Sequence, residues 1–265
     1  MIKSGTKGFF HDGFGYAVKI LSVISALFIL MYICIAIIRM NFPYELEWLE
    51  GGLVDQVNRI IDGKPLYESP SIYNVPFLYP PVYFYVSAFF AFIFGRGFFP
   101  LRFVSFFSSL VSFLMIFLIV KRETKNNWIA IISTGLFAAS FRVTGAWFDI
   151  ARVDSLFVAV FLVFVYFARG QDSNKKAVLA GILGALVFLV KQTGLVICFP
   201  IFLYLLIKNK RRGILSLAIF LLTIGISTII FNKFTDGWYS VYVFNLLRQQ
   251  TEWIPSMFIT FWGVD

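Results

Sequence analysis

Long apolar runs separated by short charged segments dominate the hydrophobicity pattern of the chain. The first run, Ile20–Ile38, follows Lys3, Lys7 and Lys19 and lacks a convincing cleavage site, so we expect a retained membrane span and not a signal peptide. Six further runs have the composition of membrane helices: Phe103–Val120, Trp128–Phe141, Ser155–Ala168, Ala177–Val190, Gly194–Ile207 and Gly213–Phe231. The pattern therefore predicts an all-α, polytopic transmembrane helix bundle of about seven spans.

One more apolar run, Pro81–Phe94, decides the topology. It begins with two prolines, contains tyrosines and is short, which is more typical of an interfacial or re-entrant segment than of a span. If it does not span, the segments 1–19, 121–127, 169–176 and 208–212 share one side of the membrane. They contain 13 Lys and Arg and 3 acidic residues, a net charge of 13 − 3 = +10, whereas the rest of the chain has 10 basic and 11 acidic residues, a net charge of −1.

Positive loops remain in the cytoplasm, so this asymmetry favours the topology in which Pro81–Phe94 does not span. We predict a multi-pass protein of the plasma membrane, with a cytoplasmic N-terminus and a long external first loop, residues 39–100. Residues 1–232 are expected to form one membrane module, and residues 233–265 an external or interfacial tail.

Composition agrees with a membrane protein and excludes several kinds of site. The chain is 59% hydrophobic and 14% charged, whereas a soluble domain is about a quarter charged. Its net charge of +9 lies in short clusters between apolar runs, which indicates topology signals and no nucleic-acid partner. Cys34 and Cys198 lie inside apolar runs, and His11 is the single histidine, so neither a disulfide framework nor a His-based triad or zinc site is predicted.

Charged residues interrupt the external ends of several apolar runs. The stretch WFDIARVDSL, residues 147–156, contains Asp149, Arg152 and Asp154, and Lys191 lies between two later runs. The runs beside Asp154 and Lys191 are too short for the ~30 Å hydrocarbon core, so both residues are expected in a protein-lined cavity at or below the outer surface. Ionisable groups at that depth are costly and usually functional. The alternative is an Asp154–Lys191 or Asp149–Arg152 pair that only fixes helix packing.

The first loop contributes further carboxylates. Residues 45–67, ELEWLEGGLVDQVNRIIDGKPLY, have apolar residues at helical spacing and predict an amphipathic helix on the outer membrane surface, with Trp48 at the interface. Gly63 and Pro65 are expected to end it. Glu47 and Glu50 are three residues apart and are expected on its opposite face, beside the cavity, the alternative being a solvated acidic face. Tyr79 begins an aromatic stretch that composition alone assigns to anchoring.

These residue types suit sugar transfer from a lipid-linked donor. A carboxylate can deprotonate an acceptor hydroxyl or amine as a general base. Lys191, Arg152 or Arg102 can neutralise a departing lipid phosphate. A polyprenyl-phosphate-sugar is the expected donor, since no Gly-rich phosphate loop for a nucleotide sugar is present, and the acceptor is an external glycan, lipid or protein. The sequence assigns no definite cofactor and leaves metal dependence open, since Glu50 and Asp154 could ligate Mg²⁺ or Mn²⁺.

The order of the motifs WLEGG, GKPLY, YPPVYFYVSAFFAFIFG, LRFVS, ARVDSL and LVKQTG resembles the GT-C superfamily of polytopic glycosyltransferases, which includes protein O-mannosyltransferases and lipid A aminoarabinose transferases. The resemblance covers roughly residues 15–210. It implies that Glu50, or Glu47 nearby, is the acid of the first loop. Leu49 stands where many relatives have Asp, which leaves open which of the two glutamates is the base.

The same resemblance implies roles for other residues. Asp154 corresponds to a second acidic site, Lys191 to a basic position near the donor phosphate, and Arg102 to the arginine that opens span two. Asp149 and Tyr79 are expected to support the site. Superfamily members usually continue through further spans or an external domain, so the chain is expected to be a fragment or a minimal version.

Three hypotheses follow. The leading one is an inverting sugar transfer, which predicts that Glu50→Gln abolishes turnover and leaves the protein level unchanged. The second is a transporter or flippase of lipid-linked saccharides, which would place ionisable groups near the membrane midplane and show internal repeats. The third is a non-catalytic assembly protein whose charges only fix helix packing.

Overall fold

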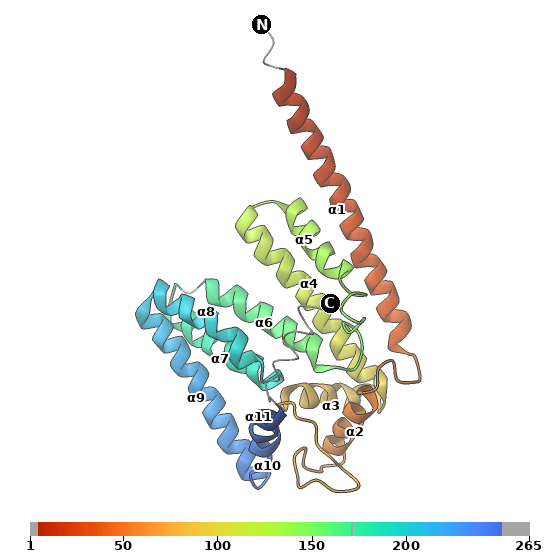
Figure 1. Ribbon diagram of the computed structural model, residues 1–265, viewed down its shortest axis with the longest axis vertical. Coiled ribbons are helices and arrows are strands. Elements are labelled where there is room, and N and C mark those ends of the chain that lie inside the picture. Colours follow the sequence, from red (N-terminus) through yellow and green to blue (C-terminus); the bar gives the residue numbers. More distant parts are fainter. Residues whose placement is uncertain (1–4, 171, 251–265) are drawn as a thin grey trace.

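A computed structural model describes residues 5–170 and 172–250 (Figure 1). This part of the chain is built from helices, and its β-structure is limited to an isolated bridge between Ser71 and Asn74. The all-α class is therefore confirmed. Residues 251–265 of the predicted tail lie outside the described residues.

Each of the seven predicted runs coincides with one helix of the bundle, except that Trp128–Phe141 extends two residues beyond its helix. The helices are α1 (Gly5–Met40), α4 (Phe98–Thr124), α5 (Asn127–Ala139), α6 (Val153–Arg169), α7 (Asn174–Val190), α8 (Gly194–Lys208) and α9 (Lys210–Phe234). Within the described residues, α1, α4 and α9 have the length and composition to cross a membrane. The other four have 13 to 17 residues. At 17 residues, α6 and α7 are longer than the predicted runs and reach about 26 Å.

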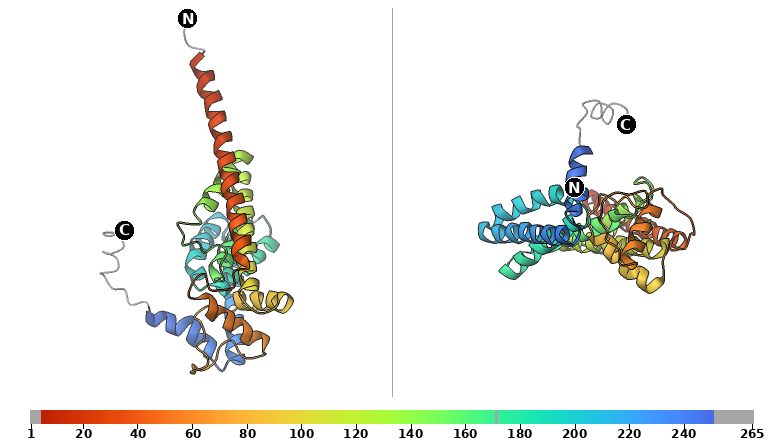
Figure 2. Two further views of the ribbon diagram at one scale, coloured as in Figure 1. Left: turned by 90° about the vertical axis from the view of Figure 1, so that its right-hand side faces the viewer. Right: turned by 90° about the horizontal axis from the view of Figure 1, so that it is seen from below.

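The helices pack as two groups joined by one central helix. α1, α4 and α5 lie together, α7, α8 and α9 lie together, and α6 packs against both α4 and α7 (Figures 1 and 2). Small residues allow close helix contact in both groups. A Cβ atom on Gly135 would lie 2.5 Å from the Ser25 Cα on α1, and one on Gly181 would lie 2.5 Å from the Ser216 carbonyl oxygen on α9. Glycine at these positions therefore sets the α1–α5 and α7–α9 distances.

The basic loops meet at one end of the bundle. An Arg169 nitrogen lies 2.8 Å from a Glu123 carboxylate oxygen, and Lys208 Nζ donates a 3.1 Å hydrogen bond to the Arg169 carbonyl. The first loop, residues 140–152 and Lys191 lie together at the opposite end, which we call the site end. This arrangement requires that Pro81–Phe94 does not span, as predicted. It forms α3 (Val82–Phe94), which lies across the ends of the long helices (Figure 1).

The amphipathic helix of the first loop is shorter than predicted. α2 spans Glu50–Ile61, and Gly63 with a φ of +71° follows its end, as expected for a C-terminal cap. Leu53 and Val57 are buried on the predicted apolar face, and Trp48 is 78% exposed. The expectation that Glu47 and Glu50 share a polar face is wrong, because Glu47 precedes the helix and Glu50 is its buried first residue.

The segment after α9 closes the site end of the bundle. It contains α10 (Trp238–Ser240), the π-helical turn η1 (Val241–Asn245) and α11 (Leu246–Gln250). Tyr239, Tyr242 and Val243 are buried in one hydrophobic cluster with residues of α2, α3 and the first loop, among them Leu53 and Tyr67. Residues 235–245 therefore pack against the predicted membrane module.

Candidate functional site

A buried ion pair between Glu50 and Arg102 lies at the centre of the site end. Both side chains are fully buried, with 0% exposure. Arg102 Nε and Nη2 donate to the two carboxylate oxygens of Glu50 at 2.9 and 2.6 Å. The remaining Arg102 donors reach main-chain carbonyls that follow α1, those of Arg39 at 3.2 Å, Phe42 at 2.6 Å and Tyr44 at 2.7 Å. All five N–H groups of the guanidinium are thus used.

The Glu50 carboxylate is saturated in the same way. In addition to Arg102, its oxygens accept the N–H of Leu46 at 2.6 Å and that of Ala151 at 2.7 Å. Burial by itself would raise the pKa of Glu50, but the hydrogen bonds from Arg102, Ala151 and Leu46 outweigh it and hold this pKa below its usual value. Glu50 is therefore a fixed carboxylate that joins the first loop to the segment before α6.

Four other charged residues form a partly exposed series of ion pairs, which we call the charged row: Glu47, Arg152, Asp154 and Lys191. Arg152 Nη1 lies 3.0 Å from Glu47 Oε1, and its Nε donates to Asp154 Oδ2 at 2.9 Å. Lys191 Nζ donates to Asp154 Oδ1 at 2.6 Å. The four side chains are 10% to 25% exposed. The row therefore alternates carboxylates and cations along one accessible line.

Helix geometry explains why the row forms. Arg152 is the extended residue before α6, Asp154 lies in the first turn of α6, and Lys191 directly follows α7. α6 and α7 are antiparallel neighbours, so the start of one lies beside the end of the other. An acid at a helix N-terminus and a cation at a C-terminus are both favoured by the helix dipole. Of the two alternative pairs considered from sequence, Asp154–Lys191 is present.

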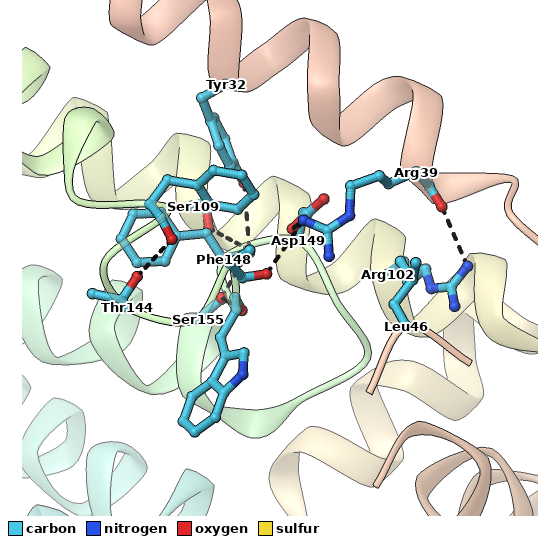
Figure 3. A network of polar contacts seen from close by, with 12 residues as sticks. Tyr32, Arg39, Leu46, Arg102, Ser109, Thr144, Phe148, Asp149 and Ser155 are labelled. Atoms are coloured by element: carbon cyan, nitrogen blue, oxygen red, sulfur yellow. Dashed lines mark hydrogen bonds and ion pairs between the residues drawn. The ribbon is translucent and has the colours of Figure 1, made fainter. Parts of the chain in front are cut away.

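Asp149 has a different partner from the one considered. It pairs with Arg39 at the end of α1, where Nη1 lies 3.2 Å from Oδ1, so the alternative Asp149–Arg152 pair is wrong. Figure 3 shows the Arg39 guanidinium directed at Asp149 while its carbonyl accepts from Arg102. Neither Asp149 oxygen makes a hydrogen bond with the described residues. Burial raises the pKa of Asp149 to about 6, against the opposing effect of Arg39.

Hydroxyl groups hold the segment that carries these charges. The Phe148 carbonyl accepts from Ser109 at 2.7 Å, Ser155 at 2.8 Å and Tyr32 at 3.4 Å (Figure 3). Ser105 donates to the Arg152 carbonyl at 3.2 Å. The serines of α4 therefore fix residues 148–152 against that helix.

Aromatic and amide groups surround the row. The Arg152 guanidinium carbon lies 4.0 Å from the centre of a Trp147 ring, a cation–π contact. Tyr79 is close enough to Arg152 for an electrostatic interaction, and its carbonyl accepts the Tyr67 hydroxyl at 2.7 Å. Gln192, next to Lys191, donates to the Leu78 carbonyl. A small cavity of about 120 Å³ reaches Asp154 and is lined by Trp147, Ser109 and Thr144.

The described residues contain no group of three or more His, Cys, Asp or Glu side chains that could hold a metal ion. The chemistry of the carboxylates also does not favour a cation between Glu50 and Asp154. Glu50 uses its oxygens on four N–H donors, and both oxygens of Asp154 face cations.

Sequence reasoning missed Arg39, Ser105, Ser109 and Gln192. Arg39 carried a usable signal, because a cation at the end of the first span opposite the basic loops departs from the positive-inside pattern and needs a local partner. The serines carried a weaker one, since Ser105, Ser109 and Ser112 recur at helical spacing in an apolar run.

Comparison with known proteins adds one finding. The family model described as dolichyl-phosphate-mannose-protein mannosyltransferase matches residues 79–234, which include Arg102, Arg152, Asp154 and Lys191. No curated protein and no solved structure matches the chain.

Proposed function

The chain belongs to the dolichyl-phosphate-mannose-protein mannosyltransferase family and is a membrane glycosyltransferase of that type; we propose that it moves a sugar from a polyprenyl-phosphate-linked donor to an external acceptor at the site end. The observation that supports this proposal is the charged row. It offers two cations for a phosphate and two carboxylates for a proton, at one accessible place.

The donor phosphate competes with the carboxylates for the same cations. Lys191 and Arg152 neutralise Asp154 in the free protein. A donor phosphate bound to these two cations weakens their hold on Asp154, whose carboxylate becomes more basic. Phosphate binding thereby prepares the proton acceptor.

The transfer step then balances without a further reactant. The acceptor oxygen forms a bond to the anomeric carbon of the sugar, and the bond between that carbon and the phosphate oxygen breaks. The acceptor proton goes to Asp154 or Glu47, and the electron pair of the broken bond remains on the polyprenyl phosphate, which Lys191 and Arg152 stabilise. A single displacement of this kind inverts the anomeric configuration.

Glu50 and Arg102 act on the row through the main chain. Glu50 binds the N–H groups of Leu46 and Ala151, the residues immediately before Glu47 and Arg152. We assign Glu50 and Arg102 as positioning residues that hold both halves of the row, and Tyr79 and Asp149 as supports beside them. The base is then Asp154 or Glu47.

The test is turnover of a polyprenyl-phosphate-mannose donor by the purified full-length chain. Asp154→Asn and Glu47→Gln are compared with Asp62→Asn, a control that removes a carboxylate from the exposed Arg96–Asp62 pair of the same loop. We expect the variant that lacks the base to lose about 10²–10⁴-fold in turnover, with the control unchanged. Turnover equal to wild type in both row variants would refute the assignment.

The orientation is also open to experiment. The basic end is expected in the cytoplasm and the site end outside. In a chain without Cys34 and Cys198, Trp48→Cys and Lys125→Cys place single thiols at exposed positions at the two ends. A membrane-impermeant thiol reagent applied to intact cells should label position 48 and not position 125, and the reverse pattern would exclude an external site.

A further inference from the structure

An open apolar groove runs between α1 and α5. Its volume is about 500 Å³, within the range of sites that hold small molecules. Met31 and Tyr32 on α1 and Ala138 and Ala139 on α5 line it, and Phe141 continues it toward the site end. The walls are apolar, so the groove suits a hydrocarbon chain.

A cation stands at one end of this groove. Arg142 lines the groove, and its exposed guanidinium has no hydrogen bond or ion pair with any described residue. Val143 beside it is 88% exposed, as a residue in contact with lipid can be. Arg39, at the end of α1, lies on the same side, with its guanidinium 5.5 Å from the centre of the Phe141 ring. An apolar groove that ends in a free arginine at a helix end matches a lipid with an anionic headgroup.

The groove is separate from the charged row. It shares no lining residue with the cavity at Asp154. The aromatic side chains of Phe137 and Phe148, stacked with ring centres 4.8 Å apart, belong to the Asp154 side. A phosphate at Arg142 therefore does not face the reacting carboxylates, which argues against a donor molecule in the groove.

We propose that the α1–α5 groove binds one acyl chain of an anionic phospholipid, whose phosphate contacts Arg142. Such a lipid would also stabilise the segment that carries the site. Phe141, Arg142, Val143 and Ala146 line the groove, and the site residues Trp147, Asp149 and Arg152 follow in the same segment. Arg39 joins the two regions, because its guanidinium contacts both the Ala146 carbonyl at 3.4 Å and Asp149 at 3.2 Å.

The experiment measures lipid retention and does not use turnover. The full-length chain is placed in nanodiscs with equal amounts of phosphatidylglycerol and phosphatidylcholine, and lipids that remain bound after release are counted by native mass spectrometry. Arg142→Gln removes the headgroup contact, with Arg96→Gln as a control at the same end and outside the groove. Met31→Trp narrows the groove, with Leu30→Trp as a control on an exposed α1 position that does not line it.

The wild type should retain phosphatidylglycerol preferentially. Arg142→Gln should reduce that preference about fivefold, the size expected for one cation near an anionic surface. Met31→Trp should reduce retention of both lipids, and the two controls should behave as wild type. Equal retention in all five proteins would overturn the proposal, as would displacement of phosphatidylglycerol by added polyprenyl phosphate, which would identify the groove as a donor site.

Discussion

Replacing Glu50 by glutamine should destabilise the fold, and the structure predicts by how much. Each carboxylate oxygen accepts one Arg102 donor and one main-chain N–H, so the amide nitrogen of Gln would face two donors in either orientation. Arg102 would also keep a buried charge without a counter-ion. Removing one partner of a buried ion pair costs roughly 3–5 kcal/mol. For a chain of this size that lowers Tm by on the order of 10 °C.

The assay is thermal unfolding of the purified protein in detergent, with turnover measured on the same samples. Glu45→Gln, an exposed carboxylate of the same loop, is the matched control and should leave Tm unchanged. The double variant Glu50→Leu/Arg102→Met should recover part of the loss, because it removes the unpaired charge. Recovery should be incomplete, since the carbonyls of Arg39, Phe42 and Tyr44 lose their donor.

The outcome separates two roles for Glu50. The resemblance to the superfamily implies a base, whose amide variant would be inactive and stable. The saturated geometry predicts a variant that loses stability, and loses turnover because Glu47 and Arg152 are displaced. An inactive Glu50→Gln protein with the Tm of wild type would refute the positioning role.

Two further predictions concern Asp149 and Lys191. Because burial raises the pKa of Asp149 from 3.8 to about 6, the folded state binds more protons than the unfolded state in this window, and stability is lost as pH rises through about 6. The Tm of wild type minus that of Asp149→Asn should therefore fall between pH 4 and pH 7, and a constant difference would show that Asp149 does not titrate in this range. Lys191→Met should lower turnover more than Lys191→Arg, since the cation is needed when the phosphate departs; equal turnover in the two variants would exclude that role.

The positions of the helices, and which loops share an end of the bundle, could be predicted because both depend on local composition. Apolar runs located α1 and α4–α9, and the charge of the basic loops predicted that Pro81–Phe94 does not span. The lengths of α4, α6 and α7 were underestimated, because charged ends such as Lys121 and Arg122 still continue α4. The end of an apolar run therefore does not mark the end of the helix that contains it.

The pairing of charges could not be predicted in the same way. Glu50 and Arg102 are 52 residues apart, and without a fold nothing in the sequence distinguishes Glu50 from Glu47. The amphipathic pattern placed both glutamates on one polar face of the helix, opposite its apolar residues. Tertiary contact overrode that pattern, because Arg102 and two main-chain N–H groups satisfy a buried carboxylate that solvent would otherwise have to satisfy.

This difference in burial between Glu50 and Glu47 implies different roles for the two carboxylates. The carboxylate that accepts four hydrogen bonds has no lone pair left for a substrate proton, so its saturation suits support and not proton transfer. The same four bonds hold the residues before Glu47 and Arg152, so the reactive groups can remain partly exposed without losing their positions. The buried Glu50–Arg102 pair and the accessible row therefore have complementary roles. The pair fixes the geometry of the site, and the cations of the row can change their partner from a carboxylate to the donor phosphate.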